Sequence, residues 1–468
     1  MKFIKKVINI LLMLTNNELL KKYSAPVPRY TSYPTSPHFN NDVTSEVYEN
    51  WIATIPSDEG LSLYFHIPFC DTLCWFCGCH TKITRRYEPV QKYLKYLFRE
   101  IELVAQKFKE SHGDKRQPVK HIHWGGGSPT ILEPSDILKL ANHIFENFAV
   151  MSDAEFAVEI DPRGMTMEAV RALADAGVTR ASLGIQDMTE KVQKAINRIQ
   201  PYDETKAVVE LLKSEGITDI NFDLIYGLPH QDLDCIRANV DAVKALKPTR
   251  LALFGYAHVP WMKTHMKMIP EDALPSSEER MEQQQLATEL LCEAGYRAIG
   301  LDHFALPDDP LSLAVEENRL TRNFQGYTDD EAETLIGMGV SSIGVSDAGY
   351  IQNFPDMRSY VRAIDDNKLP VAKGIATTSN DRMRRTAIQH VMCRYEVKLD
   401  DIADQYGEVD TLSQTLGPRL AEFEADGLIS RNGKTIKVTE EGKPFVRVVA
   451  ALFDEYLETG KGKHSQAV

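Results

Sequence analysis

The sequence lacks long apolar runs, an excess of positive charge and a large number of cysteines. A transmembrane helix needs about 20 consecutive apolar residues, and no run of that length occurs among the 468 residues. The formal net charge is -14, whereas a general nucleic-acid binder needs a basic face for phosphate contacts. Seven cysteines are too few for a disulfide scaffold in a chain this long. The sequence therefore predicts a globular protein with no membrane span and no nucleic-acid partner.

The first residues superficially resemble a signal peptide. Three lysines within the first six residues precede an apolar run at 7–14. Asn9 interrupts that run, and no small-residue cleavage site follows it. We expect a cytoplasmic protein whose first residues are an exposed or mis-assigned start, with Met13 as the candidate initiator.

From about residue 60 onward, short apolar β-rich runs alternate with segments of helix length. Helices are expected at 90–109 and 137–148, and strands at 61–69, 119–124, 156–160, 181–185, 220–225 and 251–256. This spacing predicts an α/β fold in which parallel strands with right-handed crossovers form a partial or complete (β/α) barrel. Catalytic side chains of such barrels lie at the C-terminal strand ends. The polar residues at these ends are Cys70, Gly125, Gly126, Gly127, Ser128, Glu159, Gln186 and Asp223.

After about residue 375 the pattern changes. Helices are expected at 382–395 and 418–425, where Pro418 suits a first helical turn. A hairpin at 427–438, turning at Asn432 and Gly433, precedes a final helix at 445–457. This order predicts a small winged-helix-like domain, and its acidic runs favour a packing or lid role over DNA binding. We divide the chain into an N-terminal extension with a substrate-gating segment (1–58), a barrel (59–370) and a C-terminal domain (371–468).

Four of the seven cysteines lie within ten residues. Cys70, Cys74 and Cys77 form a C-x3-C-x2-C pattern directly after a predicted strand. Ordinary electron-transfer clusters use four cysteines, one per iron, so three leave one iron open to an external ligand. The methionine part of S-adenosylmethionine (SAM) offers an amino group and a carboxylate for that position.

Zinc is the alternative for the same loop, with nearby His80 as a further ligand. Structural zinc sites usually pair two such knuckles, and no second knuckle is present in the sequence. Cys79 remains open as a fourth ligand, a catalytic residue or a bystander. Cys235, Cys292 and Cys393 are scattered, and we expect them to be inert core residues.

The cysteine loop and seven further motifs resemble the oxygen-independent coproporphyrinogen III oxidases, a family of radical SAM enzymes. The resemblance covers roughly residues 23 to 460, and the first twelve residues have no family counterpart. The matching motifs are PRYTSYPT at 28–35, YFHIPFC at 64–70, CWFCGC at 74–79, HWGGG at 123–127, EIDPR at 159–163, DLIYGLP at 223–229, DHFA at 302–305 and RNFQGYT at 322–328.

The resemblance implies a reaction in haem biosynthesis. Coproporphyrinogen III would lose two propionate carboxylates without oxygen and become protoporphyrinogen IX, through a 5′-deoxyadenosyl radical generated at a [4Fe-4S] cluster. It also implies an electron donor such as a flavodoxin or ferredoxin system, and we expect a monomer.

The resemblance assigns ligands residue by residue. Cys70, Cys74 and Cys77 would hold the cluster, and two SAM molecules would bind. Residues matching contacts to the first SAM are Tyr64, Gly126, Glu159 and Ile343. Those matching contacts to the second are Phe76, Gly127, Ser128, Gln186, Arg198, Asp223 and Ala257. Ser128 stands where the family usually has threonine.

The residue types suit these assignments. Glycines 125–127 are expected to leave backbone groups open to the methionine amine and carboxylate. Glu159 and Asp223 can accept ammonium or ribose hydroxyl groups, and Arg198 can pair with a carboxylate. We assign Cys79 a catalytic role.

A substrate with four carboxylates needs cations. The candidates are Arg29, Lys82, Arg85, Arg86 and Arg322. Arg29 lies with Tyr30 in a segment that is expected to fold over the barrel mouth, and we predict substrate contacts for Arg29, Tyr30 and Arg322.

Two other interpretations stay open. A haem-binding or haem-delivering relative would share the fold and the cluster loop. Such relatives typically lack the cysteine at position 79 and the 28–35 segment, and this chain has both. A more remote alternative is a non-enzymatic zinc or nucleic-acid module.

Overall fold

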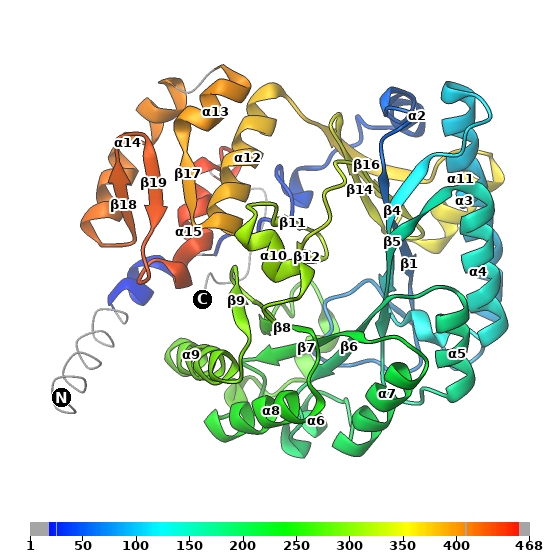
Figure 1. Cartoon of the computed structure of the whole chain (residues 1–468), viewed down its shortest axis with the longest axis horizontal. Helices are drawn as coiled ribbons and strands as arrows, with labels where there is room; N and C mark the ends of the chain where they lie inside the picture. The colour runs from blue at the N-terminus through cyan, green and yellow to red at the C-terminus, as the bar shows by residue number, and fades with distance from the viewer. Residues whose placement is uncertain (1–17, 25, 408–409, 458–468) are drawn as a thin grey trace.

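The computed structural model describes residues 18–24, 26–407 and 410–457. The lysine-rich start and Met13 lie outside the described residues. A large curved sheet forms the greater part of the structure, and a smaller domain lies beside the open edge of this sheet (Figure 1).

The sheet has twelve strands in the order β16-β15-β14-β13-β1-β4-β5-β6-β7-β8-β10-β9. Its centre is parallel and is made of β13 (Leu335–Met338), β1 (Leu61–Ile67), β4 (Pro118–Gly126), β5 (Ala149–Ile160), β6 (Arg180–Gln186), β7 (Asp219–Tyr226) and β8 (Arg250–Gly255). Its antiparallel edges are β14 (Ile343–Ser346), β15 (Gly349–Asn353) and β16 (Val371–Ala376) on one side, and β10 (His303–Ala305) and β9 (Arg297–Ile299) on the other. The six expected parallel strands are confirmed. The edge strands do not pair with each other within the described residues, so the barrel is partial.

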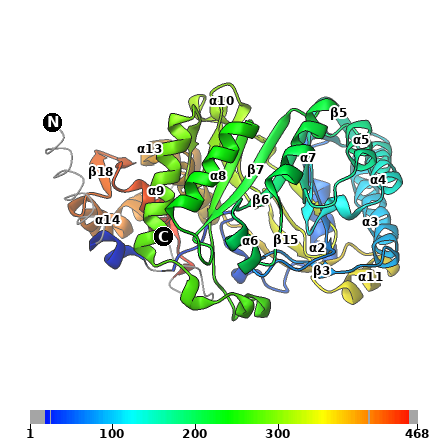
Figure 2. The same ribbon diagram turned by 90° about the horizontal axis from the view of Figure 1, so that it is seen from below.

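Helices form the outer layer around the parallel strands (Figure 2). They are α2 (Ser45–Thr54), α3 (Glu88–His112), α4 (Pro134–Asn147), α5 (Met167–Asp175), α6 (Glu190–Ala195), α7 (Tyr202–Ser214), α8 (Leu233–Leu246), α9 (Ser277–Glu293) and α11 (Met357–Asp365). In α3, Val90, Leu94, Leu97 and Ile101 recur at helical spacing and are all buried in the main core. The helices expected at 90–109 and 137–148 are confirmed.

Successive side chains of the parallel strands point alternately to the outer helices and to the barrel interior. On β5, Phe156 and Val158 belong to the main core, whereas Glu155 and Glu159 take the opposite face. On β7, Phe222 and Leu224 are core residues and Asp223 faces inward. The interior is therefore lined by polar side chains, whereas the outer face supplies the apolar core.

The smaller domain contains α12 (Ser379–Arg394), β17 (Glu396–Lys398), α13 (Leu399–Tyr406), α14 (Asp410–Ala425), β18 (Ile429–Asn432), β19 (Thr435–Val438) and α15 (Val446–Ala450). Its three strands pair in the order β17-β19-β18, and the expected hairpin is confirmed. A second hydrophobic core joins these elements to Leu19, Tyr23, Val27 and Tyr30 of the N-terminal segment. The boundaries at residues 58 and 370 stay a prediction.

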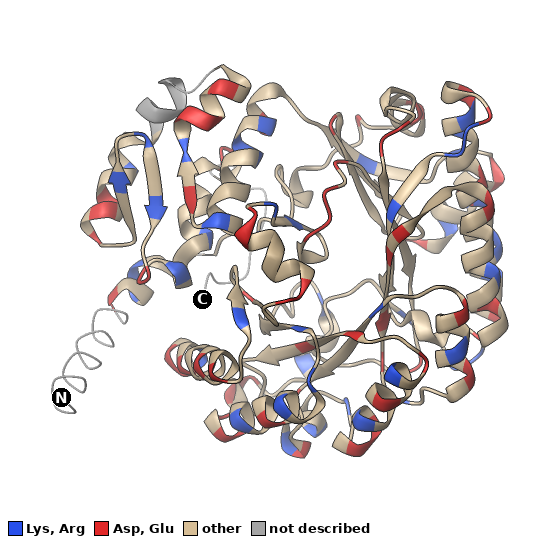
Figure 3. Cartoon of the chain, in the orientation of Figure 1, with Lys and Arg blue, Asp and Glu red and all other residues tan. Residues whose placement is uncertain are grey.

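Acidic and basic residues both occur along this domain, rather than one sign of charge (Figure 3). Among the described residues, no helix is both long enough and apolar enough to cross a membrane.

Two expectations in the smaller domain and one in α9 are wrong. The helix expected at 445–457 is only α15 followed by a 3-10 turn, because Asp454 is extended and its carboxylate accepts the Tyr30 hydroxyl and the backbone N–H of Tyr456. Pro418 lies inside α14 instead of opening it, because buried Leu416 and Leu420 continue the packed face on both sides of it. Cys292 is exposed, whereas Cys235 and Cys393 are buried as expected.

A buried carboxylate ties α3 to the end of β13, to β15 and to α11. Glu100 accepts hydrogen bonds from the backbone N–H of Gly339 (2.7 Å), the side-chain amide of Asn353 (2.6 Å) and the hydroxyl of Tyr360 (2.5 Å). Burial outweighs these hydrogen bonds and raises the pKa of Glu100 to about 7. The folded protein therefore holds this proton at pH values where the unfolded chain has released it.

We expect the stability that this proton contributes to be lost as the pH rises from 4.5 to about 7. Replacing Glu100 by glutamine removes the ionisation, so the variant should gain about 2 kcal/mol relative to the wild type between pH 5.5 and 7.5. Thermal unfolding of both proteins at the two pH values measures this difference. An equal pH dependence in both proteins would contradict the assignment.

Candidate active site

The cysteine loop follows β1 and is held by its backbone. After β1, the short strand β2 (Phe69–Cys70) pairs with β3 (Lys82–Ile83). Lys263 donates to the carbonyl of Cys79 (2.9 Å), and the His265 ring hydrogen-bonds the carbonyl of Cys77 (2.8 Å). The Asn197 amide donates to the carbonyl of Leu73 (2.8 Å). These contacts fix the loop without using the thiols.

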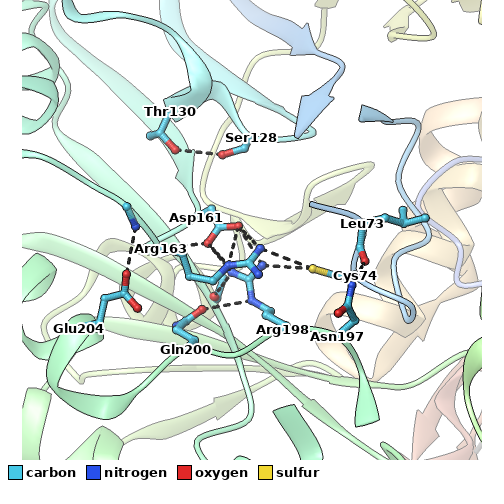
Figure 4. Close-up of polar contacts among 12 residues, drawn as sticks. Leu73, Cys74, Ser128, Thr130, Asp161, Arg163, Asn197, Arg198, Gln200 and Glu204 are labelled. Carbon is cyan, nitrogen blue, oxygen red and sulfur yellow. Dashed lines mark hydrogen bonds and ion pairs between the residues drawn. The ribbon is translucent and has the colours of Figure 1, made fainter. Parts of the chain in front are cut away.

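Two arginines point at the sulfur of Cys74, which is buried (Figure 4). Arg163 donates to this sulfur over 3.7 Å and Arg198 over 3.6 Å. Both arginines also pair with Asp161, at 2.6 Å and 3.0 Å. Burial raises the pKa of Asp161, but the two guanidinium groups outweigh it, so that the pKa lies below its ordinary value. Asp161 therefore holds two cations against the loop.

These residues fit an iron–sulfur cluster. Within the described part of the chain, no three His, Cys, Asp or Glu side chains converge closely enough to hold one metal ion. A [4Fe-4S] cluster takes one thiolate per iron, so its cysteines need not converge on a single point. The neighbouring Cys79 thiol lowers the pKa of Cys77, which favours the thiolate that metals bind. The guanidinium donors at Cys74 also suit an anionic sulfur.

The glycine loop after β4 is packed against the cysteine loop. The N–H groups of Gly127 and Ser128 donate to the carbonyls of Ile67 and Phe69, both over 2.8 Å. A Cβ atom at Gly127 would lie 2.6 Å from the carbonyl oxygen of Phe69, and one at Gly126 would lie 2.5 Å from the His66 ring. The fold already uses these two N–H groups, and the expected SAM contacts of glycines 125–127 stay a prediction. The glycines allow two loops to approach each other closely.

Glu159 lies near the end of β5, beside the glycine loop. Its carboxylate accepts hydrogen bonds from the Gly126 N–H (3.0 Å) and the His123 ring (3.1 Å). Burial raises its pKa, but the hydrogen bond from His123 and the charges around it lower the pKa below the ordinary value. On β1, the Tyr64 hydroxyl contacts the His66 ring at 3.0 Å. Glu159 is thus a fixed anion at the strand ends.

Asp223 lies deeper, within β7. It accepts hydrogen bonds from Ser182 and from the side-chain amide of Asn221, both over 3.0 Å. Burial and the nearby charge of Glu159 raise its pKa to about 6. Asp223 therefore takes up a proton as the pH falls toward 6, whereas Glu159 stays ionised to lower pH.

The arrangement matches a known structure along nearly the whole chain. The coproporphyrinogen III oxidase of Escherichia coli, described as a radical SAM enzyme, aligns with a TM-score of 0.86 and 35% identity, covering 92% of this chain and 98% of its own. The oxygen-independent coproporphyrinogen III oxidase of Bradyrhizobium diazoefficiens is 44% identical, and the match covers 94% of this chain and 97% of that protein. The oxygen-independent coproporphyrinogen III oxidase of Pseudomonas aeruginosa is 40% identical, and the match covers 94% of this chain and 95% of that protein. The chain belongs to the oxygen-independent coproporphyrinogen III oxidase family.

Two family models agree with this membership. Residues 64–243 match the radical SAM superfamily, and residues 377–445 match the HemN C-terminal domain. The radical SAM family implies a [4Fe-4S] cluster and SAM. The smaller domain is therefore a regular part of these oxidases.

The remaining residues predicted to bind SAM come from separate elements. Gln186 ends β6 with a φ of +67°. Ala257 follows β8, Ile343 begins β14, and Phe76 packs against a small satellite core. The candidates therefore come from six strands of the family barrel (β1, β4, β5, β6, β7 and β14) and from the loops that carry Phe76, Gly127, Ser128, Arg198 and Ala257. The sequence alone did not predict the site contacts of four further residues, although all four lie within the family motifs: His66, His123, Asp161 and Arg163.

The substrate candidates of the oxidase differ in their surroundings. Arg29 donates to the carbonyl of Gly255 at the end of β8 (2.9 Å). Arg322 is buried and pairs with Asp302 over 3.3 Å, and the Tyr30 hydroxyl turns away to Asp454 (3.0 Å). Arg29 therefore reaches the barrel rim, whereas Arg322 and Tyr30 support the structure around it. Lys82, Arg85 and Arg86 are exposed beside the cysteine loop.

Proposed function

We propose that this protein oxidatively decarboxylates coproporphyrinogen III to protoporphyrinogen IX without oxygen, as a radical SAM oxidase of haem biosynthesis. The observation that supports it most is the three-cysteine loop at the strand ends, with Arg163 and Arg198 directed at Cys74. When bound, the cluster and SAM would supply a 5′-deoxyadenosyl radical that can take a hydrogen atom from a propionate β-carbon.

The chain's own residues would bind and position these groups. Cys70, Cys74 and Cys77 would hold the cluster. Glu159, an anion at the strand ends, suits the SAM ammonium or ribose, together with Tyr64, Gly126 and Ile343. A second SAM would lie against Phe76, Gly127, Ser128, Gln186, Arg198, Asp223 and Ala257. Cys79 is exposed beside the cluster ligands and would be catalytic. We also propose a cytoplasmic monomer that receives electrons from a flavodoxin or ferredoxin.

An anaerobic assay tests the function. The reconstituted protein is incubated with coproporphyrinogen III, SAM and a low-potential reductant, and protoporphyrin fluorescence, 5′-deoxyadenosine and methionine are measured. We expect protoporphyrin only when SAM is present. Cleavage of SAM without any porphyrin product would contradict the proposed substrate.

The hydrogen bond from Arg163 to Cys74 predicts how the reduction potential of the cluster changes when Arg163 is replaced. Hydrogen bonds to cysteine sulfur stabilise the reduced, more negative cluster. Replacing Arg163 by methionine should therefore lower the potential. A charge-assisted hydrogen bond of about 1.5–3 kcal/mol sets an upper bound of roughly 60–130 mV for one electron, and the 3.7 Å separation favours tens of millivolts.

A redox titration followed by electron paramagnetic resonance measures this shift. Arg171→Met is the matched control, because Arg171 is exposed and pairs only with Glu215 among the described carboxylates. Equal potentials for the Arg163 variant and the control would contradict the prediction.

A further inference from the structure

Four arginines from four separate elements gather at the ends of β7 and β8. Arg29 comes from the N-terminal segment, Arg280 from α9, Arg322 from β11 (Thr321–Asn323) and Arg447 from α15. The guanidinium carbon of Arg280 lies 5.8 Å from the ring centre of Tyr226, the last residue of β7. The sequence does not show this group, because these arginines lie 24 to 419 positions away from the residues that they contact.

Hydrogen bonds tie the four side chains to two short backbone stretches. Arg29 and Arg280 donate to the consecutive carbonyls of Gly255 (2.9 Å) and Tyr256 (2.8 Å). Arg322 donates to the carbonyl of Arg29 (3.4 Å), and Arg447 donates to that of Pro28 (3.1 Å). These hydrogen bonds therefore link the four arginines through residues 28–29 and 255–256 at the barrel rim.

The carboxylates of the described residues do not balance this charge. Asp302 pairs with Arg322 and also accepts from the His303 ring. Arg29 and Arg280 form no ion pair with any described carboxylate, and the Nε atom of Arg280 is buried without a hydrogen-bond partner. Burial, followed by nearby charges that include Arg29, lowers the pKa of Arg447 to about 10. Arg29 and Arg280 are half-buried, and partly withdrawing a cation from water without a carboxylate beside it is costly, so these two side chains are suited to bind an anion.

The position of the group connects it with the proposed reaction. Ala257, a predicted contact of the second SAM, directly follows the two carbonyls that Arg29 and Arg280 occupy. Arg322 and Arg447 mainly hold the N-terminal segment in place, since both donate to its backbone. Arg29 and Arg280 each donate one hydrogen bond to a carbonyl at the end of β8. A guanidinium group has five N–H donors, so further donors of each remain for a ligand.

We propose that Arg29 and Arg280 bind a carboxylate of the tetrapyrrole, specifically a propionate that is retained in the product. The inference rests on the proposed function, in which two of four propionates lose carbon dioxide and two remain. An arginine contact stabilises a carboxylate and therefore opposes its loss as carbon dioxide. The two retained propionates keep their charge throughout, so they can anchor the ring while the other two react.

Two porphyrins test the inference, because coproporphyrin III carries four carboxylates and protoporphyrin IX carries only the two retained ones. Fluorescence titration measures the dissociation constants of both for the wild type, Arg29→Gln and Arg280→Gln. We expect each variant to bind both porphyrins about 10- to 100-fold more weakly. Arg280→Lys should recover part of the affinity and keeps the test valid if Arg280→Gln does not fold.

The control is Arg297→Gln, because Arg297 is exposed and pairs with Glu316. Unchanged affinity in Arg29→Gln and Arg280→Gln or Arg280→Lys, with normal iron content, would overturn the inference. A loss confined to coproporphyrin III would also overturn it, since the arginines would then contact the propionates that react. The titration needs no turnover, so failure of the wild type to form protoporphyrin would count against the proposed function separately.

Discussion

Replacing Cys74 by alanine should abolish turnover. Cys74 is the buried cysteine of the proposed cluster ligands, and its sulfur is the shared acceptor of Arg163 and Arg198. The variant loses a ligand and also leaves two guanidinium groups without the sulfur that they face. We expect iron and labile sulfide to fall below about a tenth of the wild-type content, since structural metal sites depend on their full ligand set. No 5′-deoxyadenosine should form.

The chain supplies a matched control for this experiment. Cys292 is an exposed cysteine at the end of α9, so Cys292→Ser should keep the full iron content and activity. Circular dichroism separates loss of the cluster from loss of the fold. A Cys74→Ala protein that retains the cluster and cleaves SAM would show that Cys74 is not a ligand.

Replacing Cys79 by serine should separate assembly of the cluster from catalysis. The Cys79 side chain is exposed, and its thiol is hydrogen-bonded to Cys77. Serine keeps a hydroxyl donor for that contact but removes the thiol. We expect iron and sulfide contents close to the wild type and a turnover at least about 100-fold lower, the usual effect of losing a positioned proton donor or acceptor.

Iron analysis and the anaerobic porphyrin assay on the same preparation check this result. A protein that fails to assemble the cluster would make Cys79 a ligand or a folding element. Full turnover would remove Cys79 from the catalytic residues. Cys292→Ser again serves as the control for the loss of one thiol.

The sequence predicts the centre of the sheet better than its edges. The parallel strands bury apolar side chains on their outer face and alternate them with polar ones, and all six that were expected are present. The edge strands β9, β10 and β14 have only three or four residues, too few for a clear period. The helix expected at 445–457 ends early because Asp454 contacts Tyr30, a tertiary contact 424 residues away that local pattern does not encode.

The candidate site was predictable where its residues lie in compact motifs. Cys70, Cys74 and Glu159 belong to such motifs, and the fold places their elements together at the strand ends. Arg280 and Arg447 were missed, because each is a single arginine in an otherwise ordinary helix. Arg280 becomes a candidate anion ligand because no carboxylate of the described structure lies beside it, and only the three-dimensional arrangement shows this.

The N-terminal segment packs in the core of the C-terminal domain, and this has a consequence during synthesis on the ribosome. Tyr30 contacts Asp454, which follows it by 424 residues. At bacterial and eukaryotic elongation rates of about 5–20 residues per second, roughly 20 to 85 seconds separate the two. Arg29 is thus translated early but reaches its place at the rim only when the chain is nearly complete. Until then the N-terminal segment leaves the rim of the nascent barrel uncovered.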